Sequence, residues 1–395
     1  MRTPKITLKP KREESLLRYH PWIFSGAIAH IDGNPQEGDM VRVYSAQGEQ
    51  IASGHYQQGS ISVRILSFGN EEAGDELWLN RIRQAYRLRL LLELAGNSKE
   101  NTAYRLVHGE GDFLPGLVID IYGTTAVVQA HSVGMYRNLD RITDALKQVY
   151  GNQLNAVYSK SSATIPFKGL NVTDEYLYGQ EKNPATIIEY GNKFNVSWVD
   201  GQKTGFFLDQ RENRMLLERY CKDAKVLNTF CYTGGFSVYA LKGGAKLVHS
   251  VDSSKKAVEL TDENIALNFG ETNRHQSFVS DTLKFLRSTQ EQYNIVVVDP
   301  PAFAKHQSAL RNALQAYKRL NVAALQHIEK GGLLFTFSCS QAVSKEAFQN
   351  AIFSAAAISQ RKVRIIHRLS QPADHPVSIY HPEGEYLKGL VLYVE

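Results

Sequence analysis

The second half of the chain alternates short, almost wholly apolar runs with longer stretches in which apolar residues recur at helical spacing. The runs at 295–298 and 333–337 are typical of parallel strands that helices cover on both faces. Intervening helices of about ten residues or more imply right-handed crossovers. The pattern therefore predicts a parallel, doubly wound α/β domain over 191–395, with strands at 225–228, 247–251, 275–279, 294–298, 333–337, 363–367 and 390–394.

The first half of the chain has shorter, alternating runs that glycines separate. This pattern predicts a β-rich domain over 1–72 and an α+β domain over 73–190, with a polar break at 71–74 between them. The strands predicted in these two domains are 5–8, 40–44, 50–56, 61–66, 117–121, 125–130, 156–159, 186–189 and 193–198. The helices predicted there are near 13–19, over 75–94 and over 136–149.

The predicted helix over 75–94 carries four arginines, which lie mainly away from its apolar face. Such side chains usually form a solvated helix surface, although contacts with phosphate groups are an alternative. The four residues are Arg81, Arg83, Arg87 and Arg89.

One glycine-containing loop joins the first strand of the α/β domain to its first helix, at residues 226–236. The next strand ends in Asp252 roughly 20 residues later, a spacing at which a carboxylate accepts hydrogen bonds from ribose hydroxyls. The loop reads Cys-Tyr-Thr-Gly-Gly and lacks the glycines of a pyrophosphate cradle, which disfavours NAD and favours S-adenosylmethionine. A turn without a ligand remains an alternative. The residues expected to line the cofactor site are Asn228, Phe230, Tyr232, Gly234 and Asp252.

Three further residues with reactive or charged side chains follow neighbouring strands: Asp281, Asp299 and Cys339. Because the carboxyl ends of parallel strands meet at one edge of a sheet, we expect these side chains to converge there, with both aspartates contributing to the cofactor site. Asp281 could instead serve only as the N-cap residue of the following helix. Two prolines after Asp299 stiffen the strand exit and leave backbone carbonyls able to accept from a planar base.

A cysteine at this edge suggests covalent catalysis. Carbon 5 of cytosine is not nucleophilic in the intact ring, but a thiolate that adds to carbon 6 makes carbon 5 enamine-like. A carboxylic acid at ring nitrogen 3 stabilises the adduct, so Cys339 and Asp299 are the predicted catalytic pair. The target base has to be unstacked to reach them. A buried packing role is the alternative for Cys339 and the expectation for Cys221 and Cys231.

The composition adds little that restricts the function further. The 395 residues are 43% hydrophobic and 22% charged, without an apolar run as long as a membrane span and without metal-ligand spacing among the three cysteines. We therefore expect a cytoplasmic protein without a membrane partner or a metal. The net charge of +5 permits a polyanionic partner.

Basic and aromatic residues interleave in the predicted β-rich domain, an arrangement that suits RNA. The aromatic residues could instead form the core of a small barrel. The residues concerned are Lys5, Lys9, Lys11, Arg12, Arg18, Tyr19, His20, Trp22, Phe24, Arg42 and Arg64.

Several motifs together give the chain, over nearly its whole length, a specific resemblance to the bacterial 23S ribosomal RNA cytosine-5 methyltransferases of the large-subunit type I group. The matching motifs, in chain order, are His20–Gly26, Lys203–Arg211, Cys231–Phe236, Asp299–Pro301, Phe337–Ser340, His375–Pro376 and Pro382–Gly389. The resemblance implies an N-terminal PUA RNA-binding domain, a middle α+β domain and a class I methyltransferase domain that uses S-adenosylmethionine. It also implies ribosomal RNA as the partner, Cys339 as the nucleophile, and Phe207, Asp209 and Gln210 as cofactor contacts.

The chain departs from the wider class of RNA cytosine-5 methyltransferases at one position. Many of them carry a second cysteine where Pro301 stands here, so the base that resolves the adduct is unassigned; Lys203, Arg211 and His375 are candidates. The main alternative is a methyltransferase acting on a base amino group or on guanine without a thiol. A non-catalytic RNA-binding factor is a third possible function. The sequence does not indicate which nucleotide is modified or whether the chain forms a homodimer.

Overall fold

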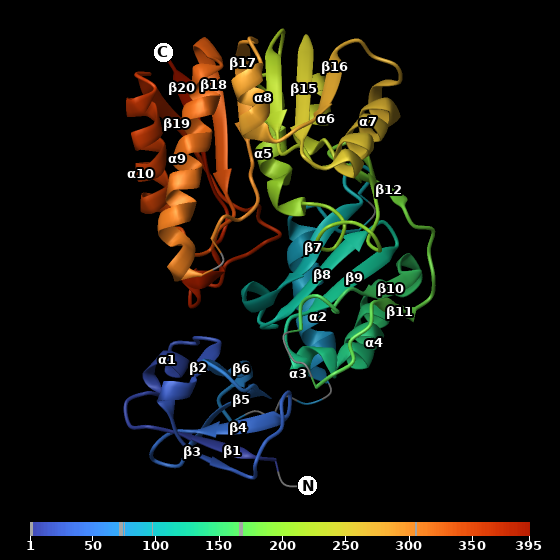
Figure 1. The fold of residues 1–395 in the computed structure, drawn as a ribbon. Helices are drawn as coiled ribbons and strands as arrows, with labels where there is room; N and C mark the ends of the chain where they lie inside the picture. The colour runs from blue at the N-terminus through green and yellow to red at the C-terminus, as the bar shows by residue number, and fades with distance from the viewer. Residues whose placement is uncertain (1–2, 71–73, 75, 97, 166–168, 305) are drawn as a thin grey trace. The chain divides into compact units, whose positions relative to one another are not determined.

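The computed structural model describes residues 3–70, 74, 76–96, 98–165, 169–304 and 306–395 (Figure 1). It has two units, called here the first and the second unit. The first unit comprises Met1–Ile187, Val196–Leu208 and Ala373–Gly384, and the second comprises Ile188–Asn195, Asp209–Pro372 and Glu385–Glu395. The three-domain division stays a prediction, and its first boundary, like most of the polar break at 71–74, lies outside the described residues.

The N-terminal part of the first unit contains a six-stranded sheet in the order β2-β6-β5-β4-β1-β3. Its elements are β1 (Lys5–Leu8), α1 (Glu14–Leu17), β2 (Trp22–Phe24), β3 (Ile28–Asp32), β4 (Met40–Tyr44), β5 (Gln50–Tyr56) and β6 (Ile61–Phe68). Four of these strands and the short helix were predicted, whereas β2 and β3 were not. Both missed strands are short and lie at the edges of the sheet, where little of their alternation is buried.

A five-stranded sheet, in the order β11-β10-β9-β8-β7, forms the rest of the first unit together with the helices that cover it (Figure 1). Its elements are α2 (Glu76–Leu91), β7 (Ala103–His108), β8 (Leu117–Tyr122), β9 (Thr125–Ala130), α3 (Val133–Tyr136), α4 (Leu139–Tyr150), β10 (Ala156–Ser159) and β11 (Glu175–Tyr178). The edge strands β7 and β11 were not predicted. Helix α2 packs against α4, and their apolar faces share one core with the sheet.

The expected solvent exposure of Arg89 is wrong, because its side chain is fully buried. Its guanidinium nitrogen Nη2 donates to Oδ2 of Asp112 at 2.8 Å, and Nε donates to the carbonyl of Arg105 at 2.7 Å. A buried guanidinium is tolerated only when its donors are paired, and here they are. The pairing partner follows 23 residues later, which helical periodicity alone does not reveal.

The second unit contains a seven-stranded sheet in the order β16-β15-β14-β17-β18-β20-β19. Its strands are β14 (Lys225–Thr229), β15 (Leu247–Asp252), β16 (His275–Val279), β17 (Tyr293–Val298), β18 (Ile328–Ser338), β19 (Val363–Leu369) and β20 (Lys388–Val394). All seven predicted strands are present. The expectation that the whole sheet is parallel is wrong, because β20 runs antiparallel to both of its neighbours. No α-helix lies between β19 and β20 in the described residues, and a parallel connection would need such a crossover.

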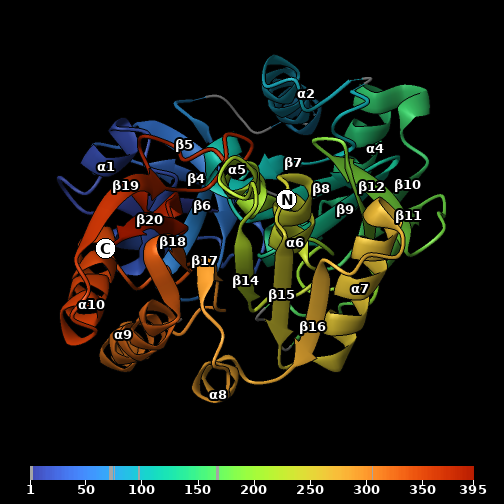
Figure 2. The same ribbon diagram turned by 90° about the horizontal axis from the view of Figure 1, so that it is seen from above.

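Helices cover both faces of this sheet, as Figure 2 shows. Helices α5 (Arg211–Glu218), α6 (Gly235–Lys242) and α7 (Lys255–Phe269) lie on one face. Helices α8 (Thr282–Ser288), α9 (Leu310–Gln326) and α10 (Lys345–Ile358) lie on the other. A two-stranded hairpin, β12 (Ala185–Glu189) with β13 (Asn192–Val196), is divided between the units. Among the described residues, we find no helix with the length and apolarity that crossing a membrane requires.

The order of the strands locates the ligand site in the second unit. Thr229 at the end of β14 pairs with Val251 of β15 on one side and with Val298 of β17 on the other. The strand order reverses between β14 and β17, and open α/β sheets bind ligands outside the carboxyl ends of the strands at such a point.

Candidate active site

The register of the sheet brings the predicted strand-end residues to one edge. Val298 pairs with Thr229 on β14 and with Thr336 on β18, so the residues that follow these three leave the sheet side by side. On the other side of β14, Asp252 of β15 pairs with Val279 at the end of β16. The ends of these strands therefore lie side by side at one edge of the sheet.

The loop after β14 has an unusual backbone. Phe230, Tyr232 and Gly234 have φ angles of 56°, 48° and 77°, in the left-handed region that favours glycine. A Cβ on Gly234 would lie 2.7 Å from Cγ2 of Thr261, so only glycine fits there. The loop is ordered by Asp252, whose Oδ2 accepts from the backbone N–H of Tyr232 at 3.1 Å.

Two buried acceptors beside this loop favour a ligand that donates hydrogen bonds. Oδ1 of Asn228 and Oδ1 of Asp209 are buried and have no hydrogen-bond partner among the described residues. Their other polar atoms are engaged, since Asn228 Nδ2 donates to Ser237 Oγ at 2.9 Å and Asp209 Oδ2 accepts from Tyr386 Oη at 2.7 Å. Buried polar atoms are nearly always paired, so an orphan acceptor requires an explanation. Ribose hydroxyls and the ammonium group of S-adenosylmethionine are suitable donors, and these residues fit that cofactor.

Asp299 lies in a short hydrogen-bonded chain. Gln210 Nε2 donates to Asp299 Oδ1 at 3.0 Å, and Asn213 Nδ2 donates to Gln210 Oε1 at 2.6 Å. The pKa of Asp299 is raised from 3.8 to about 7, chiefly by burial and also by the Asp209 carboxylate, while the bond from Gln210 and the charge of Arg214 oppose the rise. Asp299 is therefore a carboxyl group that can carry a proton at neutral pH.

Cys339 lies next to the Asp299 segment. Its Sγ atom is 3.8 Å from the backbone carbonyl oxygen of Pro300, the residue after Asp299. The two strand exits are also joined by a bond from the Ala304 N–H to Ser340 Oγ at 3.2 Å. The thiol and the acid thus belong to two connected segments of one sheet edge.

The other two cysteines are buried, as expected. Burial raises the pKa of both Cys221 and Cys231 to about 12, so neither thiol ionises at neutral pH.

The remaining predicted residues are less closely associated with this edge. Asp281 caps α8, because its Oδ1 accepts from the Lys284 N–H at 2.9 Å, which is the structural role weighed for it above. Phe207 belongs to the first unit, and its contact with the cofactor stays a prediction.

Of the candidate bases, Arg211 is fully buried on α5. His375 of the first unit is 1% exposed and its Nδ1 lies 3.0 Å from Asp374 Oδ1, and its role as a base stays a prediction.

Sequence reasoning missed two residues of the second unit, Tyr386 and Lys388. Tyr386 binds Asp209 through its hydroxyl group, and Lys388 is buried beside the segment that carries Cys339. Both lie in the Pro382–Gly389 motif, but nothing in the sequence indicates that a lysine at the start of a strand is buried.

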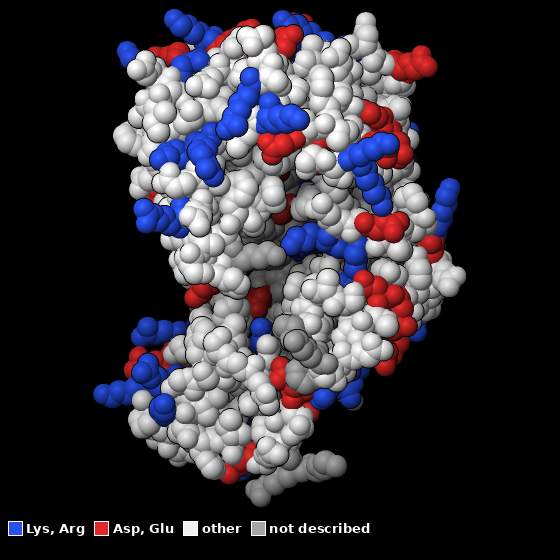
Figure 3. All heavy atoms as spheres, in the orientation of Figure 1, with Lys and Arg blue, Asp and Glu red and all other residues white. Residues whose placement is uncertain are grey.

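The first unit has a shallow hollow that combines basic and aromatic side chains. It measures about 260 Å³ and is lined by Arg12, Ser15, Trp22, Ile23, Phe24, Gly26 and Ala27. Phe24 and Tyr19 are 46% and 50% exposed, so these two aromatic residues are not core residues. Figure 3 shows lysine and arginine side chains gathered around α1, beside this hollow, and over α9 in the second unit.

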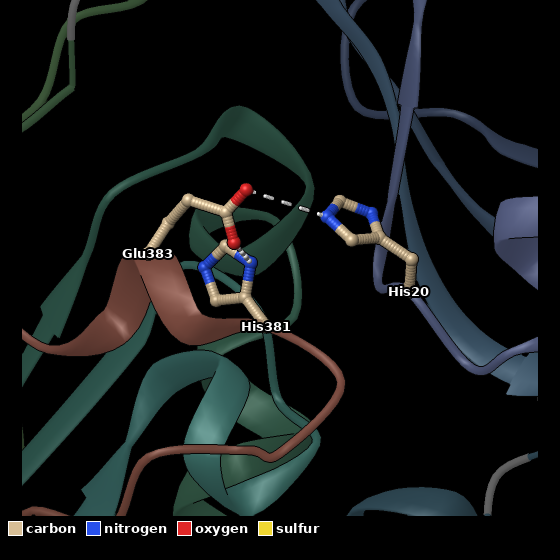
Figure 4. A group of neighbouring side chains, drawn as sticks. All are labelled: His20, His381 and Glu383. Carbon is tan, nitrogen blue, oxygen red and sulfur yellow. Dashed lines mark ion pairs between the residues drawn. The ribbon is translucent and has the colours of Figure 1, made fainter.

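Two motifs that are far apart in the sequence meet in the first unit through His20, His381 and Glu383 (Figure 4). Their ligand atoms lie within 4.8 Å of one another, although no metal site was predicted here. Glu383 Oε2 is 3.1 Å from His381 Nδ1, and its Oε1 is 3.9 Å from His20 Nε2. The ring of His381 also packs edge-on against Trp22 at 4.3 Å, so ring packing holds part of this cluster together.

The sheet order, the glycine loop and the acidic strand ends define the second unit as the catalytic domain of a class I S-adenosylmethionine-dependent methyltransferase. Comparison with known families agrees, because residues 124–387 match the S-adenosylmethionine-dependent methyltransferase family and residues 6–68 match the PUA-like domain family. The chain is 40% identical over 395 residues to "Ribosomal RNA large subunit methyltransferase I" of Tolumonas auensis, covering 98% of each chain. The chain belongs to the same family of S-adenosylmethionine-dependent methyltransferases, and its cofactor is S-adenosylmethionine.

Solved structures show the same architecture. A protein from Streptococcus mutans, provisionally described as an S-adenosylmethionine-dependent methyltransferase, superimposes with a TM-score of 0.84 at 26% identity, over 99% of this chain and 100% of that chain. A further structure, titled as complexed with SAH, has a TM-score of 0.85 at 26% identity with the same coverage. The predicted fold class, a PUA-like β domain with an α/β methyltransferase domain, is confirmed.

Proposed function

We propose that this protein methylates carbon 5 of a cytosine in 23S ribosomal RNA, with Cys339 as the nucleophile and Asp299 as the acid. One observation carries the proposal. A thiol lies 3.8 Å from the carbonyl of the residue after Asp299, whose pKa of about 7 lets it stay protonated beside a pyrimidine ring. Methylation of a base amino group can use an acid in the position of Asp299 but needs no thiol, whereas methylation of carbon 5 needs the thiol as well.

Each residue has a defined part in the reaction. The Cys339 thiolate forms a bond to carbon 6, and the displaced electron pair of the ring moves towards nitrogen 3, where the Asp299 carboxyl donates its proton. Bound S-adenosylmethionine supplies the electrophilic methyl group that the resulting enamine carbon attacks. A base then removes the proton from carbon 5, the sulfur–carbon bond breaks to return the thiolate, and nitrogen 3 gives its proton back to the Asp299 carboxylate. That base is unassigned, because Pro301 stands where many related enzymes carry a second cysteine.

We also propose which side chains hold the cofactor. The carboxylate of Asp252 would bind the ribose hydroxyls, and the orphan acceptors on Asn228 and Asp209 would take the remaining donors. The full proposed set is Phe207, Asp209, Gln210, Asn228, Phe230, Tyr232, Gly234, Asp252, Asp281 and Asp299.

The proposal that the partner is RNA rests on two observations. The relative from Tolumonas auensis is named for the large ribosomal subunit, and the hollow in the PUA-like part places Arg12 beside Trp22 and Phe24. A guanidinium that can pair with phosphate, beside the exposed ring of Phe24 that can stack on a base, suits single-stranded RNA. A ribosomal RNA substrate implies that the protein acts in the cytoplasm, and a homodimer remains untested.

The proposal is tested by replacing Cys339 with alanine. We expect the variant to bind S-adenosylmethionine and to form no 5-methylcytidine, as measured by mass spectrometry of ribosomal RNA from cells that carry only this variant. Cys221→Ala is the matched control and should leave the product unchanged, since this thiol is buried at the end of α5. Full methylation by Cys339→Ala would overturn the covalent route and favour methylation of an amino group or of guanine.

A further inference from the structure

Lys388 is a buried cation beside the predicted nucleophile. It is the first residue of β20 and pairs with Ser338, the last residue of β18, so it lies next to the residue that precedes Cys339. It is only 6% exposed. Buried lysines are rare unless they are paired, so the burial of Lys388 requires an explanation.

The ammonium group of Lys388 holds the backbone that follows the nucleophile. Its Nζ atom donates to the carbonyl oxygen of Ser340 at 2.6 Å and to that of Val343 at 2.7 Å. An ammonium has three donors, so one remains beyond these two carbonyls.

Tyr317 of α9 holds the same segment through its side chains. Its hydroxyl accepts from Ser338 Oγ at 2.9 Å and lies 3.0 Å from Ser340 Oγ. Both neighbours of Cys339 are thereby fixed by hydrogen bonds. Burial raises the pKa of Tyr317, so the phenol stays neutral and Lys388 is the cationic member of this arrangement.

The charges around Lys388 favour an anion at Cys339. The pKa of Lys388 is lowered to about 8, chiefly by burial and also by the charge of Lys345, while the charges of Cys339 and Glu385 oppose this fall. Glu385 already pairs with Lys345 at 2.5 Å and is partly exposed to solvent. The attraction between a thiolate and an ammonium is mutual, so the thiolate that favours the charged lysine is itself favoured by it.

We propose that Lys388 is a positioning residue that orients the Cys339 segment and stabilises the Cys339 thiolate before the cytosine binds. The inference rests on the proposed function, in which Cys339 is the nucleophile. Lys388 keeps its protons and forms no bond to the substrate, and the thiol releases its proton to solvent. The thiolate forms as the pH rises through the pKa of the thiol, and the support from Lys388 is lost as the pH rises above about 8.

The test measures the ionisation of Cys339 directly. The rate of alkylation by iodoacetamide is followed against pH by peptide mass spectrometry, with Cys339→Ala as the background. Cys221 and Cys231 should not interfere, because burial raises their pKa values to about 12. In the wild-type protein we expect an apparent pKa below the ordinary cysteine value of about 8.5.

Three variants test whether Lys388 is the cause of this lowered pKa of Cys339. Lys388→Met should raise the apparent pKa of the thiol by roughly one unit or more, because an opposite charge at close range shifts a pKa by that amount. Lys388→Arg should restore part of the shift. Lys345→Met is the matched control, since it removes a lysine that is 57% exposed, and should leave the thiol close to its wild-type value.

Two results would overturn the inference. One is the same alkylation profile in wild type and Lys388→Met. The other is a pKa of Cys339 at or above about 8.5 in the wild-type protein, a measurement that does not depend on whether any variant folds. Methylation at pH 7 by Lys388→Met should fall about tenfold for a shift of one unit and recover as the pH rises, whereas a purely structural loss would not recover. Failure of the proposed function is seen separately, as full activity in Cys339→Ala.

Discussion

A single variant, Asp299→Asn, tests both the raised pKa of this carboxyl group and its proposed role as the acid. Asparagine has nearly the same shape, and its side-chain oxygen can still accept the bond from Gln210. It cannot ionise and cannot give a proton to the pyrimidine ring. We therefore expect Asp299→Asn to be more stable than the wild type at alkaline pH and nearly inactive.

The size of the stability effect follows from the pKa of Asp299. A rise from 3.8 in the unfolded chain to about 7 in the fold corresponds to about 4 kcal/mol. Because the pKa is raised, the folded state favours the protonated acid, and that contribution is complete below pH 3.8 and lost as the pH rises to about 7. Above pH 7 the wild type therefore carries a cost of up to about 4 kcal/mol that Asp299→Asn does not carry.

The assay compares melting temperatures at pH 4.5 and pH 8.5, together with methylation under single-turnover conditions. The two proteins should melt at similar temperatures at pH 4.5, and the variant should melt several degrees higher at pH 8.5. Loss of the acid should lower the methylation rate by about 10²- to 10⁴-fold. Asp281→Asn is the stability control, since asparagine caps a helix as well as aspartate does.

Two outcomes would contradict the role proposed for Asp299. If Asp299→Asn and wild type had the same pH dependence of stability, the carboxyl group would not be held in its protonated form. If the variant methylated RNA at the wild-type rate, Asp299 would not be the acid, whatever its pKa.

Four further predictions concern other parts of the protein. Asp252→Ala should weaken the binding of S-adenosylmethionine by roughly tenfold or more in calorimetry, because it loses the ribose contact and the bond that orders Tyr232. Gly234→Ala should lower the free energy of unfolding by about 1–3 kcal/mol in denaturant titrations, because a left-handed φ of 77° and Thr261 both oppose a side chain. Phe24→Ala should weaken RNA binding by roughly 1–3 kcal/mol, measured by fluorescence anisotropy, because an exposed ring that can stack on a base is lost. EDTA should leave methylation and the melting temperature unchanged, because no proposed step uses a metal. A lower melting temperature in EDTA would indicate that His20, His381 and Glu383 bind a metal ion.

The sequence predicted most of the second unit because its strands bury both faces. Runs such as 295–298 are apolar at every position and have few other interpretations. The missed strands β2, β3, β7 and β11 are short or lie at sheet edges, where the pattern is weak. The direction of β20 depends on the connection before it, which carries no helical pattern to indicate its course.

The candidate site was predictable to the extent that it depends on strand ends. Asp252, Asp299 and Cys339 follow apolar runs, so their shared edge could be inferred before their distances were known. Lys388 was not predictable, because a lysine in a sequence indicates solvent exposure and its burial depends on pairing between β18 and β20. The orphan acceptors on Asn228 and Asp209 likewise appear only when the packing around them is known.

The most direct test of the account is a covalent trap. RNA that contains 5-fluorocytosine at the target position is incubated with the protein and S-adenosylmethionine, and the product is analysed by mass spectrometry. Fluorine at carbon 5 cannot leave as a proton does, so we expect a stable protein–RNA adduct attached to the peptide that contains Cys339. Methylated RNA without any adduct, or an adduct that also forms with Cys339→Ala, would contradict it.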